Sequence, residues 1–205
     1  MSTPPDYPLT NTLIHLLGAP GTGKYTVAEA MTGLCDMRLV DNHLINTPIF
    51  SLIHQDGKTA LPKRVWSNVR TVWDAVADTM VHISPPDFNF VLTNAVFNHD
   101  DDDRAHVMNI KRVADERHGT YIPVRLLISD VEEHIKRITA PGRRGRMKET
   151  NPASPARYAA YDVLKTGLST ELTLDITHLS PTEAAHKVLT YACSQTPPRS
   201  NQRGP

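Results

Sequence analysis

The chain has 205 residues, of which 40% are hydrophobic and 21% are charged. A domain of this length buries roughly 70% of its unfolded surface, so its stability requires neither disulfides nor a structural metal. The 22 basic residues balance the 22 acidic residues, which argues against a broad nucleic-acid-binding surface.

The two ends of the chain are rich in proline and polar residues. Such segments bury little apolar surface, so we expect flexible tails at residues 1–10 and 194–205 around one domain of residues 11–193. No apolar run reaches the roughly 20 residues that a membrane helix needs. The two cysteines, Cys35 and Cys193, form no CxxC motif, which favours a reducing, cytoplasmic location.

Between these tails, short apolar runs alternate with amphipathic segments. We expect strands near residues 12–17, 37–40, 88–93, 121–128 and 171–176. We expect helices near residues 23–33, 62–83, 102–118, 131–138, 156–167 and 181–192. This alternation is typical of βαβ units and predicts an α/β fold with about five parallel strands. Ligands bind such sheets beyond the carboxyl ends of the strands, so functional residues are expected just after each strand.

The segment Gly18–Lys24 (GAPGTGK) matches the GxxxxGK pattern between the first strand and the first helix. Glycines allow the backbone to curl so that its N–H groups surround a phosphate. The helix dipole and the Lys24 ammonium add positive charge. We therefore predict a nucleoside triphosphate site formed by Gly18, Gly21, Thr22, Gly23, Lys24 and Thr26. The alternative is a glycine-rich turn followed by a surface lysine.

Tyr25 stands where a serine or threonine normally binds Mg²⁺ in such loops. In this respect the loop resembles that of the nucleoside-monophosphate kinases, an adenylate kinase-like group of P-loop proteins whose GxPGxGKGT motif also lacks that hydroxyl. The resemblance implies ATP and Mg²⁺ as cofactors, with the metal held mainly by phosphates and water and by no protein ligand. We expect Tyr25 either to cover the nucleotide or to pack on the first helix.

Asp41 ends the second strand. A carboxylate at this edge would face the γ-phosphate, where it could accept a proton from a substrate hydroxyl or organise a metal-bound water. The placement resembles small-molecule kinases of the shikimate kinase and chloramphenicol phosphotransferase type, which carry an acidic residue after their second strand. Alternatively, Asp41 caps the following helix, with Asn42 as the competing cap. His43 is a weaker candidate for substrate binding.

Thr93 and Asn94 end the third strand, where a Walker-B aspartate would stand. The absence of that aspartate argues against a motor ATPase or GTPase. Thr93 and Asn94 can donate hydrogen bonds to a neutral acceptor. Arg64 and Arg70 lie on the helix at 62–83, which corresponds to the substrate-binding flap of the resembled group. They could clamp an anionic acceptor, or they belong to a solvated helix face.

Residues 136–148 contain six lysines and arginines and no acidic residue. The resemblance implies a lid at about 139–155 whose arginines fold over the triphosphate, and Arg137 and Arg144 are the candidates for stabilising the transferred phosphoryl group. The alternative is a solvated or nucleic-acid-binding loop. Thr177 follows the last strand, where the resembled group contacts adenine.

Two further groups of polar residues are expected to be structural. The run Asp100–Asp103 begins a helix, where carboxylates favour the positive end of the dipole and cap it rather than bind a metal. His15 lies within the first strand and is expected to be buried and hydrogen-bonded.

The resemblance covers about residues 11–192 and implies a three-layer P-loop fold with strand order 2-3-1-4-5. The expected reaction transfers the γ-phosphoryl group of ATP to a hydroxyl of a small molecule. Lys24 and lid arginines would stabilise charge, and Asp41 would orient or deprotonate the acceptor. Two alternatives remain: a nucleoside or nucleotide kinase, and an ATP-binding regulatory protein with little turnover. Expected partners are ATP and the small acceptor, without a membrane or nucleic acid.

Overall fold

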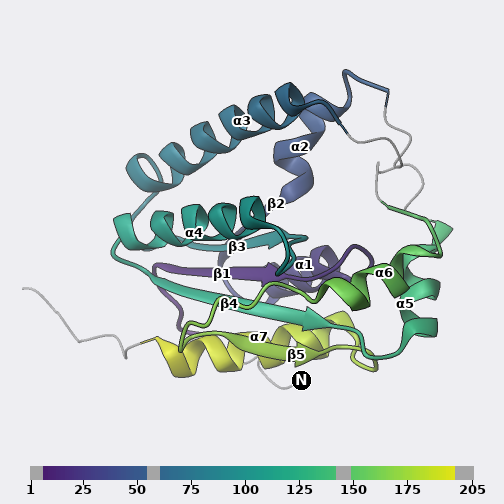
Figure 1. Ribbon diagram of the computed structural model, residues 1–205. Coiled ribbons are helices and arrows are strands. Elements are labelled where there is room, and N and C mark those ends of the chain that lie inside the picture. The colour runs from purple at the N-terminus through teal and green to yellow at the C-terminus, as the bar shows by residue number, and fades with distance from the viewer. Residues whose placement is uncertain (1–6, 55–60, 142–148, 197–205) are drawn as a thin grey trace, which may run out of the picture.

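The computed structural model describes residues 7–54, 61–141 and 149–196. Its five strands form one parallel sheet in the spatial order β2-β3-β1-β4-β5 (Figure 1). The strands are β1 (Thr12–Leu17), β2 (Met37–Asp41), β3 (Asn89–Asn94), β4 (Thr120–Leu127) and β5 (Leu172–Asp175). Both the α/β class and the strand order confirm the prediction.

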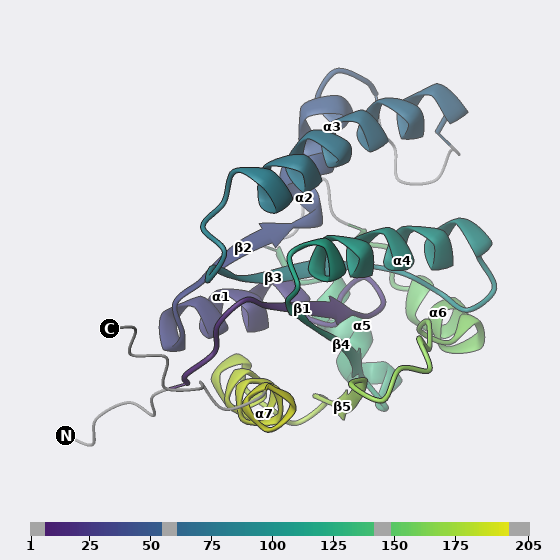
Figure 2. The same ribbon diagram turned by 90° about the vertical axis from the view of Figure 1, so that its left-hand side faces the viewer.

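Helices cover both faces of the sheet and so form three layers (Figures 1 and 2). One face packs against α1 (Lys24–Leu34) and α7 (Pro181–Gln195). The other packs against α4 (Asp101–Glu116), with α3 (Lys63–His82) outside it. Three shorter helices lie toward the carboxyl ends of the strands: α2 (Asn42–Phe50), α5 (Val131–Ile138) and α6 (Ser154–Tyr161).

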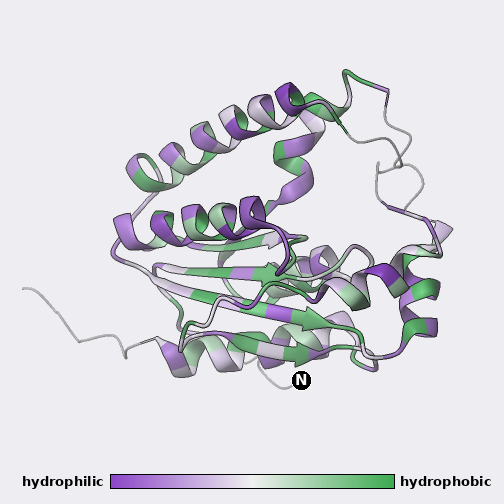
Figure 3. Cartoon of the chain, viewed as in Figure 1, coloured by the Kyte–Doolittle hydropathy of each residue, from purple (hydrophilic) through white to green (hydrophobic). Residues whose placement is uncertain are grey.

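The central strand β1 is buried on both faces, which explains its continuous apolar sequence. Ile14 and Leu16 belong to the core on the α1 and α7 side. Leu13 belongs to the core on the α3 and α4 side, because successive side chains of a strand alternate between the two faces. Figure 3 shows hydrophobic residues concentrated along these inner strands.

The helix expected at 156–167 is shorter in the structure and ends at Tyr161. Asp162 adopts a φ of 53°, a left-handed conformation that does not continue the helix. Val163 then forms an antiparallel bridge with Phe97. The buried Arg125 donates hydrogen bonds to Val163 O at 2.9 and 3.2 Å, so this segment is fixed to β4 instead of extending α6.

Part of the expected N-terminal tail packs against the domain. Leu9 is buried in the core beside α1 and α7, and the Tyr7 hydroxyl lies 2.6 Å from His186 Nδ1. Residues 1–6 and 197–205 lie outside the described residues. Among the helices that the structure describes, none is both long and apolar enough to cross a membrane.

Candidate active site

The loop between β1 and α1 has a shape that depends on its glycines. Gly21 and Gly23 have φ angles of 92° and 91°, in the left-handed region that glycine adopts without strain. A Cβ atom on Gly18 would lie 2.8 Å from Leu126 O, and one on Gly21 would lie 3.0 Å from His134 Nε2. His134 of α5 also donates from Nε2 to Pro20 O at 2.7 Å, so α5 holds the loop from outside.

The start of α1 faces this loop with positive charge. The N-cap of α1 is Gly23, which has no side chain to cap the first turn, and the helix dipole places partial positive charge there. The Lys24 ammonium donates to Gly18 O at 2.7 Å and to Ala19 O at 2.9 Å, and so lies across the loop. A curled backbone, a helix N-terminus and an ammonium together fit a polyphosphate.

The hydroxyls near the loop make local contacts. Thr22 Oγ1 donates to Ala19 O at 3.0 Å, and Thr26 Oγ1 donates to Gly23 O at 2.8 Å. Both threonines therefore brace the loop. The Tyr25 hydroxyl lies 3.4 Å from Glu29 Oε1, one turn further along α1, which favours packing along the helix over coverage of the nucleotide.

Asp41 is a buried carboxylate, 6% exposed, at the end of β2. It is the N-cap of α2, as the alternative interpretation expected, because its Oδ2 accepts from the backbone N–H of His43 at 3.3 Å. Its Oδ1 accepts from the Thr93 hydroxyl at 2.5 Å. The two strand ends thus bring Asp41 and Thr93 together, and Asn42 donates its backbone N–H to Thr93 Oγ1 at 3.3 Å.

Asn94 is the centre of a buried hydrogen-bond network. Its Oδ1 lies 2.9 Å from His15 Nε2, and its Nδ2 lies 3.2 Å from Asn42 Oδ1 and 3.1 Å from His106 Nε2. Tyr121 extends the network, with its hydroxyl 2.9 Å from His15 Nδ1. The backbone carbonyl of Asn94 accepts from Gly18 N at 3.2 Å, which joins the network to the loop of residues 18–24. His15 is buried and hydrogen-bonded, as predicted.

Both histidines of this network are neutral at physiological pH. Burial lowers the pKa of His15 to about 3 and the pKa of His106 to about 4, and the positive charge of Arg70 adds to the effect on His106. Burial raises the pKa of Tyr121, so its hydroxyl keeps its proton. The network therefore consists of uncharged donors and acceptors.

Arg64 and Arg70 are the predicted acceptor-binding arginines of α3, and they differ in how they relate to the network around Asn94. Arg64 and Arg70 are both exposed, and Arg70 lies close enough to His106 to influence its pKa. Trp73, one turn from Arg70, packs edge-on against His106 with ring centroids 5.5 Å apart. Within the described part of the chain, no hydrogen bond or ion pair joins Arg64 to the network around Asn94.

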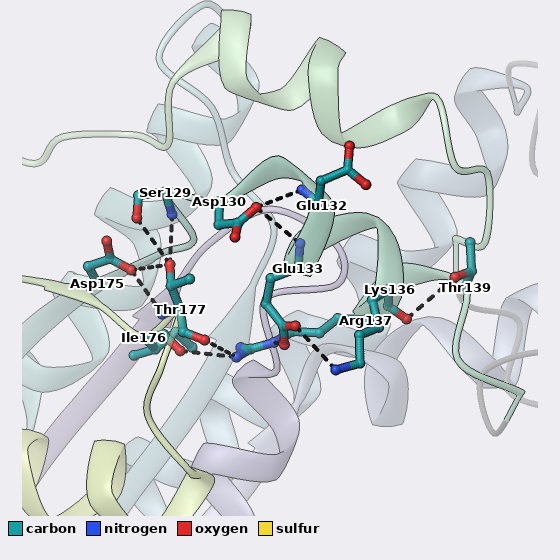
Figure 4. A network of polar contacts seen from close by, with 10 residues as sticks. All are labelled: Ser129, Asp130, Glu132, Glu133, Lys136, Arg137, Thr139, Asp175, Ile176 and Thr177. Atoms are coloured by element: carbon teal, nitrogen blue, oxygen red, sulfur yellow. Dashed lines mark hydrogen bonds and ion pairs between the residues drawn. The ribbon is translucent and has the colours of Figure 1, made fainter.

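Arg137 lies beside the segment that follows β5 (Figure 4). Its guanidinium donates to Glu133 Oε1 at 2.7 Å, to Ile176 O at 3.1 Å and to Thr177 O at 2.7 Å. This arginine lowers the pKa of the Glu133 carboxyl. Arg137 is therefore found next to Thr177, the predicted adenine contact, with its charge paired to Glu133.

The Thr177 side chain ties two loops together. Its hydroxyl donates to Asp175 Oδ1 at 2.5 Å and accepts from Ser129 N at 2.9 Å. Its carbonyl is the group that accepts from Arg137. Arg144 and most of the basic part of the expected lid, residues 142–148, lie outside the described residues.

The acidic run at the start of α4 caps that helix, as predicted. Asp100 Oδ1 accepts from the backbone N–H groups of Asp102 at 2.9 Å and Asp103 at 3.3 Å. Asp103 accepts from Phe97 N at 2.8 Å, and burial raises the pKa of its carboxyl to about 6. Among the described residues, no group of three or more histidines, cysteines, aspartates and glutamates is arranged to hold a metal ion.

Solved structures of small-molecule kinases share this architecture. The gluconokinase from Sinorhizobium meliloti 1021 matches with a TM-score of 0.60 at 14% identity, over 93% of this chain and 94% of its own. The shikimate kinase from Acinetobacter baumannii in complex with shikimate matches with a TM-score of 0.53 at 18% identity, over 92% and 95%. The fold is that of P-loop small-molecule kinases. The APS kinase from Mycobacterium tuberculosis in complex with AMPPNP and APS matches with a TM-score of 0.51 at 14% identity, over 90% and 98%.

No protein-family model and no curated protein matches the chain at a significant level. Within the P-loop kinase fold, the structure brings Asp41, Thr93 and Asn94 to one edge of the sheet beside the loop of residues 18–24. Asn42 and His106 belong to the same cluster, although the sequence analysis did not single them out as binding residues. A polar residue directly after Asp41 was a signal for Asn42, whereas nothing in the spacing of the histidines distinguished His106.

Proposed function

We propose that the protein is an ATP-dependent phosphotransferase that moves the γ-phosphoryl group to a hydroxyl of a small molecule. The main observation behind this proposal is that the loop of residues 18–24 and the polar residues at the ends of β2 and β3 lie together at one edge of the sheet. The phosphate loop with Lys24 is bonded through Gly18 N to Asn94 O, next to the buried pair of Asp41 and Thr93. The fold shared with small-molecule kinases supports the same conclusion.

On the nucleotide side, Gly18, Gly21, Thr22, Gly23 and Thr26 would shape the backbone around the β- and γ-phosphates. Lys24 would exchange its bonds to the Gly18 and Ala19 carbonyls for bonds to phosphate oxygens, which are stronger because both partners are charged. Mg²⁺, held by the phosphates and water, would neutralise the negative charge of the triphosphate. Tyr25 would stay on α1 and provide no metal ligand.

On the acceptor side, Asp41 would orient the hydroxyl and accept its proton. The hydroxyl oxygen would form a new bond to the γ-phosphorus while the bond from that phosphorus to the bridging oxygen breaks, and that oxygen would leave with ADP. Thr93 holds Asp41 in place, and we assign Asn94, His43, Arg64 and Arg70 to the surroundings of the acceptor.

Near the adenine base and the lid, Thr177 would contact adenine. Its position directly after β5 supports this role. Arg137 and Arg144 would stabilise the transferred phosphoryl group. For Arg137 this role requires that its guanidinium exchanges Glu133 and the carbonyls of Ile176 and Thr177 for phosphate oxygens. The two cysteines, Cys35 and Cys193, lack the spacing of a CxxC motif, which supports a reducing, cytoplasmic location.

A nucleoside or nucleotide kinase is the second candidate. It is favoured by Arg70, whose exposed guanidinium lies near the polar cluster and could bind an acceptor phosphate. The choice of acceptor separates the two candidates. Turnover of polyols, sugars or hydroxy acids favours the first, and turnover of nucleosides or nucleotides favours the second.

The test is ATP-dependent ADP formation across such a panel of acceptors. Lys24→Ala is expected to lower kcat roughly 100-fold or more, because it removes a charge that stabilises the transition state. Lys187→Ala, an exposed lysine on α7, is the matched control and is expected to behave like the wild type. Equal turnover of Lys24→Ala and wild type would contradict the proposal.

A further inference from the structure

The Asn94 side chain uses all of its hydrogen-bonding groups inside the protein. Its amide has two N–H donors, and these lie within bonding distance of Asn42 Oδ1 and His106 Nε2. Its carbonyl oxygen accepts from His15. Because a primary amide has only two donors, Asn94 has none left for a substrate. As a hydrogen-bond donor, Asn94 can therefore act on an acceptor only through the residues that it contacts.

The donor directions along the network follow from Asn94. Asn94 Oδ1 can only accept, so the neutral His15 carries its proton on Nε2, and its Nδ1 accepts from the Tyr121 hydroxyl. Asn94 Nδ2 can only donate, so His106 Nε2 must accept and carries no proton. A neutral imidazole has one N–H group, which places the proton of His106 on Nδ1.

His106 Nδ1 is the last hydrogen-bond donor of this network. His106 is partly exposed, and among the described residues no group forms a hydrogen bond with its Nδ1. The exposed Arg70 lies near the same imidazole, and Trp73 packs against the ring and fixes its plane. The available groups are therefore one imidazole N–H and one guanidinium, and both are donors.

We propose that Asn94 is a positioning residue for acceptor binding, which holds His106 in its Nδ1–H form as a hydrogen-bond donor to the acceptor. The group opposite His106 must then accept a hydrogen bond, and the charge of Arg70 favours a carboxylate or phosphate oxygen there. The acceptor would be a hydroxy acid or a phosphorylated alcohol. This inference about the acceptor rests on the proposed function, whereas the proton positions do not.

The direct test is the protonation of the histidine nitrogens, measured by long-range ¹H–¹⁵N NMR of the full chain at pH 7. In the wild type we expect His106 protonated on Nδ1 and His15 protonated on Nε2. Asn94→Asp replaces the donor with an acceptor-only carboxylate, so His106 is expected to gain a proton on Nε2. Tyr121→Phe removes the hydroxyl that bonds to His15 Nδ1 but leaves Asn94 in place, so His15 is expected to stay protonated on Nε2 and His106 on Nδ1.

Two matched variants control for general destabilisation. Asn89→Asp changes a buried asparagine at the opposite end of β3, which bonds to Leu9 O and Asp36 O instead. Tyr191→Phe removes a partly buried tyrosine hydroxyl on α7, which bonds to Glu171 O. Both are expected to leave the His106 and His15 signals in place. Protonation of His106 on Nε2 in the wild type, or an unchanged His106 in Asn94→Asp, would overturn the proposal.

Steady-state kinetics, measured with the acceptors that the protein phosphorylates, distinguish a failure of this inference from a failure of the proposed function. Asn94→Asp is expected to raise KM for the acceptor about tenfold or more, the equivalent of one lost hydrogen bond to a charged group, with KM for ATP unchanged. Turnover of carboxylates alone or of phosphates alone identifies the anion. An equal preference for uncharged polyols would refute the assigned acceptor class, and absence of all turnover with the expected NMR result would refute the kinase proposal alone.

Discussion

Gly21 is the residue through which the shape of the phosphate loop is most easily tested. Alanine there would adopt a φ of 92° and place its Cβ 3.0 Å from His134 Nε2. We expect Gly21→Ala to lower the free energy of unfolding by about 1–3 kcal/mol and to weaken ATP binding, because the loop must shift away from α5.

Gly33, within α1, is the matched control for this substitution. An added Cβ there meets no atom within 4 Å, and the helical backbone suits alanine. Gly33→Ala is therefore expected to raise the free energy of unfolding by about 0.5–1 kcal/mol without an effect on ATP binding. Urea denaturation and calorimetric titration measure the two quantities. Equal behaviour of the two variants would show that the loop does not require glycine at position 21.

Single residues also show which parts of the site could be predicted from the sequence and which could not. The GxxxxGK pattern has a local cause, because glycine conformations and the helix start are properties of neighbouring residues. Asp41 had two alternative roles in the sequence, and the structure shows the cap and a bond to Thr93 together. His106 could not be found, because it lies on α4 and its hydrogen-bond partner Asn94 ends β3, and only the fold brings them close.

At the level of elements, the sequence predicted all five strands because each is a short apolar run between breakers. It did not define the extent of α2, which contains Pro48. It also extended α6 beyond Tyr161, because the segment that follows is held by distant partners. Arg125 of β4 binds the Val163 carbonyl, a contact that no local pattern indicates.

The whole molecule should lose stability as the pH falls below about 6.5. The pKa values of His15 and His106 are lowered from 6.5 to about 3 and about 4, so between these values the unfolded chain binds more protons than the folded one. Stability is then full above the unfolded pKa and declines with acidification. The pKa of the Asp103 carboxyl is raised from 3.8 to about 6. This has the opposite effect on stability and offsets part of the contribution of one histidine.

Two histidines outweigh one partly exposed carboxyl, so we expect the free energy of unfolding to fall by at least about 1.4 kcal/mol per pH unit near pH 5. Urea denaturation at pH 7, 6 and 5 measures this slope. His106→Asn removes one of the two histidines, and its slope is expected to be smaller than that of the wild type. A stability that is constant or rises between pH 7 and pH 5 would contradict buried, neutral histidines.

The claim on which the enzymatic account rests is that the loop of residues 18–24 surrounds the phosphates of a nucleotide. The most direct measurement is a crystal structure of the protein with Mg²⁺ and a non-hydrolysable ATP analogue. We expect the β-phosphate within hydrogen-bond distance of backbone N–H groups of residues 21–24, with the Lys24 ammonium moved from the Gly18 and Ala19 carbonyls to phosphate oxygens. An analogue bound elsewhere, with Lys24 still on those carbonyls, would contradict the account.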